Sequence, residues 1–150
     1  MQNPKIDPAK AQQTFIVIWF ALFVSQFLFL LLVYFTRPEV ARLDLSQPLL
    51  DKNALVVIVI AAFSITDLTI SFAMRKKYLD QAIAEQNINL VSTALIVGCA
   101  LNEAISLFGV VLAFAFEYPY FWLFSALGIF GTILHFPRRS NIEAAAYRLN

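Results

Sequence analysis

Four long apolar segments dominate the pattern of hydrophobic and polar positions along the chain. They cover residues 15–35, 54–74, 90–116 and 119–136, and stretches with charged residues or proline separate them. Each segment is near or above the length that an α-helix needs to cross the hydrocarbon core of a bilayer. The pattern therefore predicts an all-α integral membrane protein, with four transmembrane helices in an antiparallel bundle and one domain over residues 1–150.

The stretches between these segments predict short connections. Pro38 and Pro48 interrupt any long helix between the first two segments, and a turn near Gln86-Asn87 is expected between the second and third. Glu117-Tyr118-Pro119 predicts a very tight turn, which makes the third and fourth helices antiparallel neighbours. At the ends we expect a short tail over residues 1–13 and a C-terminal surface helix over residues 140–149.

The basic residues predict an orientation. Eight of the eleven lysines and arginines lie in the N-terminal tail, the 75–89 connection and the C-terminal region, and three lie in the 36–53 connection. Cytoplasmic connections carry the excess of Lys and Arg, so with four crossings both termini, the short tail included, are expected to be cytoplasmic. We expect a multi-pass protein of the bacterial inner (plasma) membrane.

Composition narrows the functional classes. The chain is 60% hydrophobic and 14% charged, whereas soluble domains average about 45–50% and about 25%. A net charge of +1, with basic residues scattered at segment ends, argues against nucleic acid as a partner. Cys99 and His135 are the only residues of their types. We expect no metal, no cofactor and no enzymatic activity, with His135 held at the membrane interface by local polar groups.

Glu103 is the one charged residue of the third segment and stands at its midpoint, about 20 Å from either end of a helix. A charged carboxylate at that depth costs about 2.5–3.5 kcal/mol on insertion scales. Because no Lys or Arg lies within the four segments, an ion pair within the chain is excluded, and we expect a raised pKa and a largely neutral acid. Glu103 is therefore the candidate proton-binding residue.

A helical projection supplies candidate neighbours for this acid. Glu103 falls beside a stripe of small and polar residues, so we expect it to face a close protein neighbour and to lie too far from His135 to act with it. Ser64, Asp67 and Ser71 share one face of the second helix, and Gln26 is polar near the middle of the first. The candidates for contact with Glu103 are Asn102, Ser106, Ser64, Asp67, Ser71 and Gln26, and those for close helix packing are Gly98, Gly109, Gly128 and Gly131.

Residues 98–114 read G-C-A-L-N-E-A-I-S-L-F-G-V-V-L-A-F, and residues 114–121 continue F-A-F-E-Y-P-Y-F. This stretch resembles the ion-binding helix of the c subunit of rotary ATP synthases, with its small residues, its A-L-x-E-A core and its G-L-V-x-A continuation. The resemblance implies that Glu103 is the proton-carrying carboxylate, with Ala104 and Ile105 typical of proton-type members. The rest of the chain is not matched, and residues 54–74 lack the glycine strip of the family's first helix.

Two functions stay open on this basis. The first is a non-enzymatic small subunit of a larger membrane complex, such as a bioenergetic one, with the bilayer and other subunits or further copies of itself as partners. The second is a c-subunit-like proton-translocating subunit in which Glu103 carries the proton.

Overall fold

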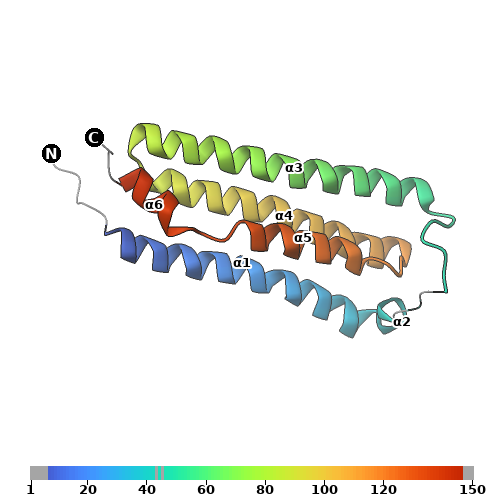
Figure 1. Cartoon of the computed structure of the whole chain (residues 1–150). Coiled ribbons are helices and arrows are strands. Elements are labelled where there is room, and N and C mark those ends of the chain that lie inside the picture. The colour runs from blue at the N-terminus through green and yellow to red at the C-terminus, as the bar shows by residue number, and fades with distance from the viewer. Residues whose placement is uncertain (1–6, 43, 45, 147–150) are drawn as a thin grey trace.

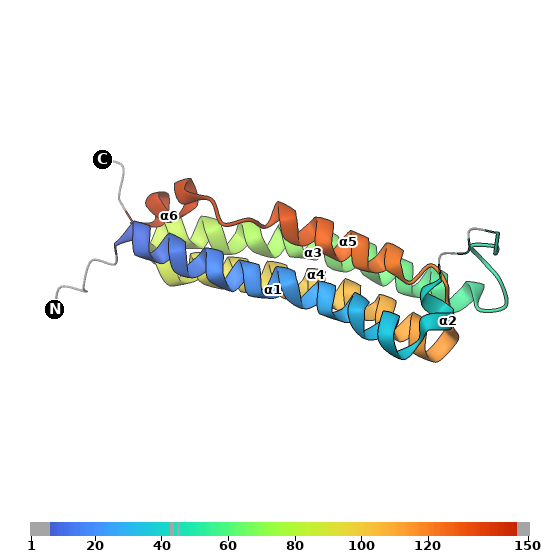
Figure 2. The same cartoon turned by 90° about the horizontal axis from the view of Figure 1, so that it is seen from below.

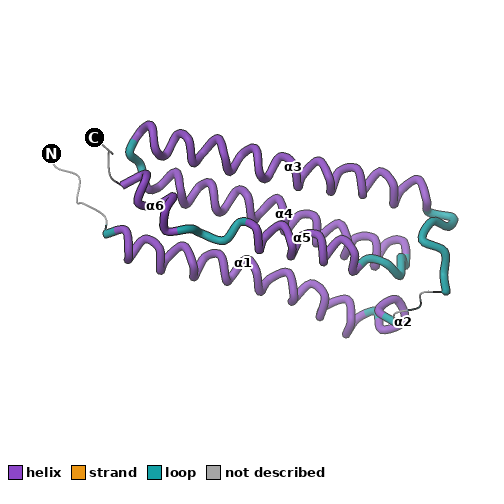
Figure 3. The backbone as a smooth tube through the Cα atoms, viewed as in Figure 1, coloured by secondary structure: helices purple, strands orange, loops and turns teal. Residues whose placement is uncertain are grey.

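The computed structural model describes residues 7–42, 44 and 46–146, and this part of the chain is built from helices with no β-strand (Figure 3). The all-α prediction is therefore confirmed. Residues 1–6 of the predicted tail and residues 147–149 of the predicted terminal helix lie outside the described residues. The helices are α1 (Pro8–Thr36), α2 (Pro38–Ala41), α3 (Ala54–Glu85), α4 (Ile88–Phe116), α5 (Trp122–Leu134) and α6 (Arg139–Ala146).

Three helices, α1, α3 and α4, are long and apolar enough to cross a membrane. They contain the first three predicted segments and extend beyond them, so the predicted tail is already helical from Pro8. The fourth segment differs from the prediction. The helix α5 has 13 residues, about 20 Å, which is short of the roughly 30 Å hydrocarbon core.

The ends of α5 have local causes. The predicted helix begins at residue 119, but residues 119–121 belong to the turn after α4. The helix α5 therefore begins only at Trp122. At the other end, Pro137 has no N–H and disfavours helical backbone in the residue before it. The chain accordingly leaves the helix at His135.

The helix α4 lies at the centre of the arrangement and packs against α1, α3 and α5 (Figures 1 and 2). In Figure 1, α1 and α3 run along opposite sides of the α4–α5 pair. Side chains from α1, α3 and α5 therefore meet on α4, which makes α4 the element that positions any shared site.

Two non-glycine residues with positive φ make the tight turns. Gln86, with φ 52°, ends α3, and Asn87 caps α4 by accepting a hydrogen bond from the Asn89 N–H, which places the turn at Gln86-Asn87 as predicted. Glu117, with φ 51°, ends α4, and the next N–H, of Tyr118, donates to the Leu112 carbonyl at 3.1 Å.

The helix α6 closes one end of the bundle (Figure 1). Its Ile142 and Ala145 are fully buried in an apolar cluster with the first turns of α1 and α4 and the last turns of α3. The members of this cluster are Ala11, Phe15, Ala82, Ile88, Val91, Leu95, Cys99, Ile142 and Ala145.

Exposed large apolar side chains form a band around the rest of the bundle. On the long helices they run from Val17 to Phe35, from Leu55 to Phe72 and from Ile96 to Phe114, with Ile83 as an outlier beyond the band on α3. Each range covers about 27–29 Å of helix, close to the thickness of a bilayer's hydrocarbon core. We call this band, together with the exposed apolar residues of α5, the lipid belt.

Candidate functional site

Among the described residues, eight polar side chains are buried inside the bundle, mostly at the level of the lipid belt. Water and lipid offer them no hydrogen bonds there, so they must bond to one another or to backbone groups. They come from α1, α3, α4 and the α5 region: Gln26, Ser64, Ser71, Asn102, Ser106, Ser125, Thr132 and His135. We call this set the polar core.

One chain of hydrogen bonds joins α1, α4 and α5. The Ser106 hydroxyl donates to Gln26 Oε1 at 2.7 Å, and Gln26 Nε2 donates to Thr132 Oγ1 at 2.6 Å. The indole N–H of Trp19 donates to the Thr132 carbonyl at 2.8 Å. The Gln26 amide thus uses a donor and its acceptor to hold two neighbouring helices in register with its own.

A second group joins α3, α4 and the end of α5. Asn102 Nδ2 donates to the Gly98 carbonyl at 2.8 Å and lies 3.5 Å from Ser71 Oγ and 3.4 Å from His135 Nδ1. The two ring nitrogens of His135 lie 2.8 Å from the Gly131 carbonyl and 3.4 Å from the Ser71 carbonyl. A carbonyl only accepts, so the short bond is made by the tautomer with its proton on Nδ1.

The position of His135 differs from the interfacial one expected from the sequence. Its ring is fully buried, and it packs on Phe72 with ring centroids 4.8 Å apart. Because α5 is short and antiparallel to α4, its end reaches only the middle of α4, opposite Gly98 and Asn102. His135 therefore lies about one to two helical turns from Glu103 along α4, and no hydrogen bond joins these two described side chains.

All four glycines of the chain lie where α4 meets α5. A Cβ on Gly109 would lie 2.6 Å from the Phe121 carbonyl oxygen, and one on Gly128 would lie 2.5 Å from the Asn102 carbonyl oxygen. A Cβ on Gly98 would collide with the His135 ring, and one on Gly131 with the Asn102 amide. The missing side chains let the two backbones approach closely enough for the polar core to form.

Two polar atoms of the core have no hydrogen-bond partner among the described residues: Asn102 Oδ1 and Ser125 Oγ. The Asn102 oxygen lies against Gly131, at the position that a Cβ would take. The contacts of Nδ2 alone therefore fix how the Asn102 side-chain amide is turned. Its NH2 group faces the acceptors, which are the Gly98 carbonyl and the Ser71 hydroxyl.

Glu103 lies outside the polar core. It is half-buried and sits on the outward face of α4 with exposed Ile96 and Leu107, because these positions differ from it by seven and four residues. The Ser25 hydroxyl of α1 donates to Glu103 Oε1 at 2.7 Å and also approaches the Leu22 carbonyl at 2.8 Å. None of the six residues expected to contact Glu103 hydrogen-bonds to it within the described chain.

One step along the helix explains this division. Successive helical residues are rotated by about 100°, so Asn102 points into the bundle while Glu103 points away from α5. Among the predicted neighbours, the structure brings together Gln26, Ser106, Asn102 and Ser71. Ser64 is buried but donates to the Ile60 carbonyl of its own helix.

Asp67 also lies outside the polar core. It is half-buried on α3, and no hydrogen bond or ion pair joins it to a described residue. The exposed Thr66 and Thr69 on either side of it return their hydroxyls to carbonyls of α3. Within the belt, Asp67 and Glu103 are thus the two acidic residues with access to the outside of the bundle.

Sequence reasoning did not propose Ser25, Thr132 or Arg75 as site residues. Arg75 donates to the Leu134 and Phe136 carbonyls at 2.6 and 3.2 Å, which satisfies the open end of α5 with a cation. Ser25 and Thr132 are visible in the sequence as hydroxyl residues inside apolar segments, but nothing in the sequence shows which polar residue lies opposite them.

The described residues contain no group of three or more His, Cys, Asp or Glu side chains positioned to hold a metal ion. The fold and the site together define a class: an all-helical protein with three helices of membrane-spanning length and a polar core buried at their middle. Comparison of the chain with family models, with curated proteins and with solved structures found no match.

Proposed function

We propose that the chain is a non-enzymatic integral-membrane subunit of a larger membrane complex, and that it contacts its partner through the Glu103 face of α4. One observation carries the proposal. Glu103 is half-buried on the outward, lipid-belt face of α4 and has the Ser25 hydroxyl as its hydrogen-bond donor. The fully buried polar side chains of the described residues are directed into the bundle instead.

The energetics favour an additional donor from outside the chain. A carboxylate offers about four acceptor sites, and one hydroxyl fills one of them. Facing lipid, such a group costs about 2.5–3.5 kcal/mol on insertion scales. A partner helix that brings a hydrogen-bond donor to this depth removes most of that cost. The position of Glu103 therefore stabilises the complex with such a partner.

The chemistry of the partner follows from the same face. Ile96, Leu107 and Val111 surround Glu103 with exposed apolar surface, so the partner presents an apolar helix with one basic or hydroxyl residue near its middle. The belt of this chain contains no Lys or Arg. A second copy therefore cannot supply the ion pair, which favours a different protein as the partner.

Photocrosslinking in native membranes tests this function. A photoreactive residue in place of Leu107, one turn from Glu103, is expected to form an adduct with a second protein. The matched control is the same residue in place of Phe63, which is exposed in the belt on α3. Adducts with lipid alone at both positions, together with a lone monomer after extraction in mild detergent, would contradict the proposal.

A second candidate function is proton translocation with Glu103 as the carrier. It is supported by the access of the carboxylate to the membrane and by its hydroxyl neighbour Ser25, which is the kind of donor that holds an ion-binding carboxylate in place. An apolar carbodiimide is expected to label Glu103, faster at low pH because the reagent attacks the protonated acid. Glu103→Gln is expected to abolish proton movement while the complex still assembles; absence of labelling at every pH rules this candidate out.

A further inference from the structure

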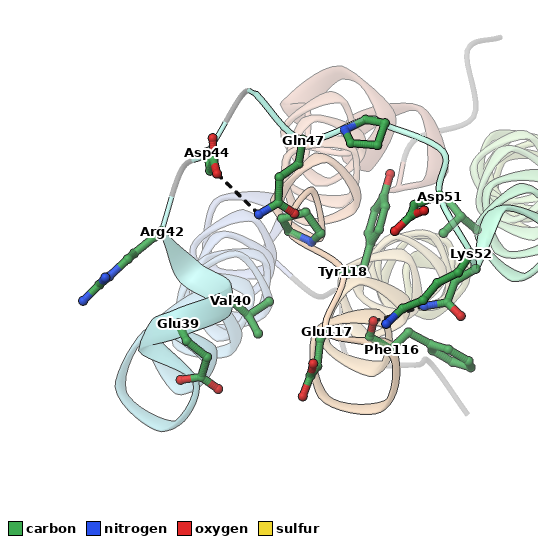
Figure 4. A pocket seen from close by; sticks show the side chains of 14 residues that line it. Glu39, Val40, Arg42, Asp44, Gln47, Asp51, Lys52, Phe116, Glu117 and Tyr118 are labelled. Carbon is green, nitrogen blue, oxygen red and sulfur yellow. Dashed lines mark hydrogen bonds between the residues drawn. The ribbon is translucent and has the colours of Figure 1, made fainter.

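A polar cavity and an apolar groove meet at the end of the bundle that carries α2. The polar cavity, of about 420 Å³, lies among α2, the connection to α3 and the turn after α4 (Figure 4). The apolar groove, of about 280 Å³, lies along α3 and α5. Val57 and Tyr118 line both, so the two spaces adjoin at these residues and give a site with a polar and an apolar half.

The apolar half has the depth of one lipid leaflet. On α3 it is lined from Val57 to Ile65, and on α5 from Leu123 to Leu127. Measured from the start of α3 at Ala54, Ile65 lies about 16 Å along the helix, roughly half the thickness of a hydrocarbon core. The groove therefore starts at the membrane surface and ends near its middle, as an acyl chain of one leaflet does.

The polar half carries both signs of charge. Four carboxylates and two basic side chains line it. Arg37 lies 3.4 Å from Glu39 and 4.0 Å from Glu117, and Asp44 accepts from the hydroxyl of Ser46. Asp51 and Lys52 have no hydrogen bond or ion pair from their side chains to any described residue, and Arg42 points away from the other lining side chains in Figure 4.

Two tyrosines hold this space open. Tyr118 donates to the Leu49 carbonyl at 3.1 Å, and Tyr120 donates to the Gln47 carbonyl at 2.6 Å, which fixes the connection against the turn after α4. Burial raises the pKa of the Tyr118 phenol, so it remains a neutral donor. The cavity is thus preformed by the fold, as ligand sites usually are.

We propose that this composite cavity binds one phospholipid with an amine-bearing, zwitterionic headgroup. The headgroup ammonium pairs with Asp51, the phosphate pairs with Lys52, and one acyl chain occupies the groove between α3 and α5. An anionic headgroup fits less well, because the four lining carboxylates still outnumber the two lining basic side chains and the neighbouring Arg37 together.

Native mass spectrometry of the full chain tests the proposal, with phosphatidylethanolamine and phosphatidylglycerol of the same acyl chains supplied in equal amounts. One phosphatidylethanolamine is expected to stay bound in preference. Ala61→Trp fills the groove and is expected to abolish retention, whereas Ala62→Trp, on the neighbouring exposed position of the same helix, leaves it unchanged. The same comparison can be made on α5 with Leu123→Trp, which fills the groove, and Leu134→Trp, which lies outside it, as the control. Both positions are exposed, so neither change disturbs core packing.

The headgroup has its own pair of variants. Asp51→Asn is expected to lower the preference for the amine-bearing lipid about tenfold, while Asp80→Asn, which changes an exposed acid of α3 outside the belt, leaves it unchanged. The headgroup assignment is overturned if the unaltered chain retains the two lipids equally, or if the Asp51 variant keeps the same preference for the amine-bearing lipid as the Asp80 variant. Equal retention by the Ala61 and Ala62 variants shows ordinary surface lipid and overturns the site itself.

Discussion

The two faces of α4 place their polar side chains in opposite environments at the same membrane depth. The inward face carries Asn102 and Ser106 between glycines, and these side chains are fully buried and hydrogen-bonded to α1 or α3. The outward face carries Glu103 among exposed apolar side chains, with one hydroxyl as its donor. A single residue step separates Asn102 from Glu103.

This difference separates polar groups that stabilise the fold from a polar group that remains free to bind a partner. The inward groups hold four segments together, and removing any of them leaves a partner unsatisfied where no water reaches. The outward carboxylate holds α1 through Ser25 only, so its remaining acceptor capacity is open to a partner. Stability measurements on variants of the two faces should therefore differ in size.

The largest effect is expected from Gly128→Val, which places a branched side chain between α4 and α5. Its Cβ would lie 2.5 Å from the Asn102 carbonyl oxygen, and backbone cannot move aside as a flexible side chain can. We expect a loss of about 3 kcal/mol or failure to fold. Unfolding in detergent micelles, followed by loss of helical circular dichroism, measures it against Ala126→Val on the exposed side of α5; equal effects of both variants would contradict close packing at Gly128.

His135→Ala is expected to have the next largest effect. The change removes a fully buried ring that packs on Phe72 and at Gly98, and it leaves a cavity and the Gly131 carbonyl without the Nδ1 donor. These losses together suggest about 2 kcal/mol. The same unfolding measurement on Ile133→Ala, at an exposed position of α5, is the control and should change by less than about 0.5 kcal/mol. If His135→Ala changes the free energy of unfolding by as little as the control does, the histidine does not stabilise the inward face of α4.

A double-mutant cycle on Gln26 and Ser106 sharpens the inward side further. The hydroxyl of Ser106 donates to Gln26 Oε1 at 2.7 Å, so Gln26→Leu and Ser106→Ala should not be additive. Between membrane helices such coupling averages about 0.6 kcal/mol and reaches about 1.7 kcal/mol. A cycle between Gln26 and Ser64, which bonds within α3, should give a coupling near zero.

Most of the fold could be predicted because lipid leaves the backbone few choices. Long apolar segments must be helical to satisfy their own backbone groups, and Asn87 is a typical N-cap, so the position of the turn before α4 followed. The extent of α5 could not be predicted in the same way. It depends on where the turn after Glu117 releases the chain and on Pro137, and apolarity alone treats residues 119–136 as one helix.

The site was harder to predict because membrane helices are apolar on both sides. In a soluble protein the polar face is the exposed one, but here lipid and core select similar residues and the pattern does not distinguish them. Glu103 and Asn102 therefore looked like members of one polar side. Only the contacts with Ser25 on α1 and with His135 near α5 separate them, and both depend on helix register that the sequence does not display.

The smallest effect on stability is expected from Glu103→Gln, and this variant tests the comparison most directly. Glutamine keeps an acceptor for Ser25 and has nearly the same shape, so unfolding of the isolated chain should change by less than about 0.5 kcal/mol. Retention of the partner should nevertheless fall, because glutamine replaces one carboxylate oxygen with an amide N–H and so weakens the contact with a basic or hydroxyl donor of the partner. If Glu103→Gln instead destabilises the isolated chain as much as His135→Ala does, the outward carboxylate is as structural as the inward core, and the distinction between the two faces of α4 fails.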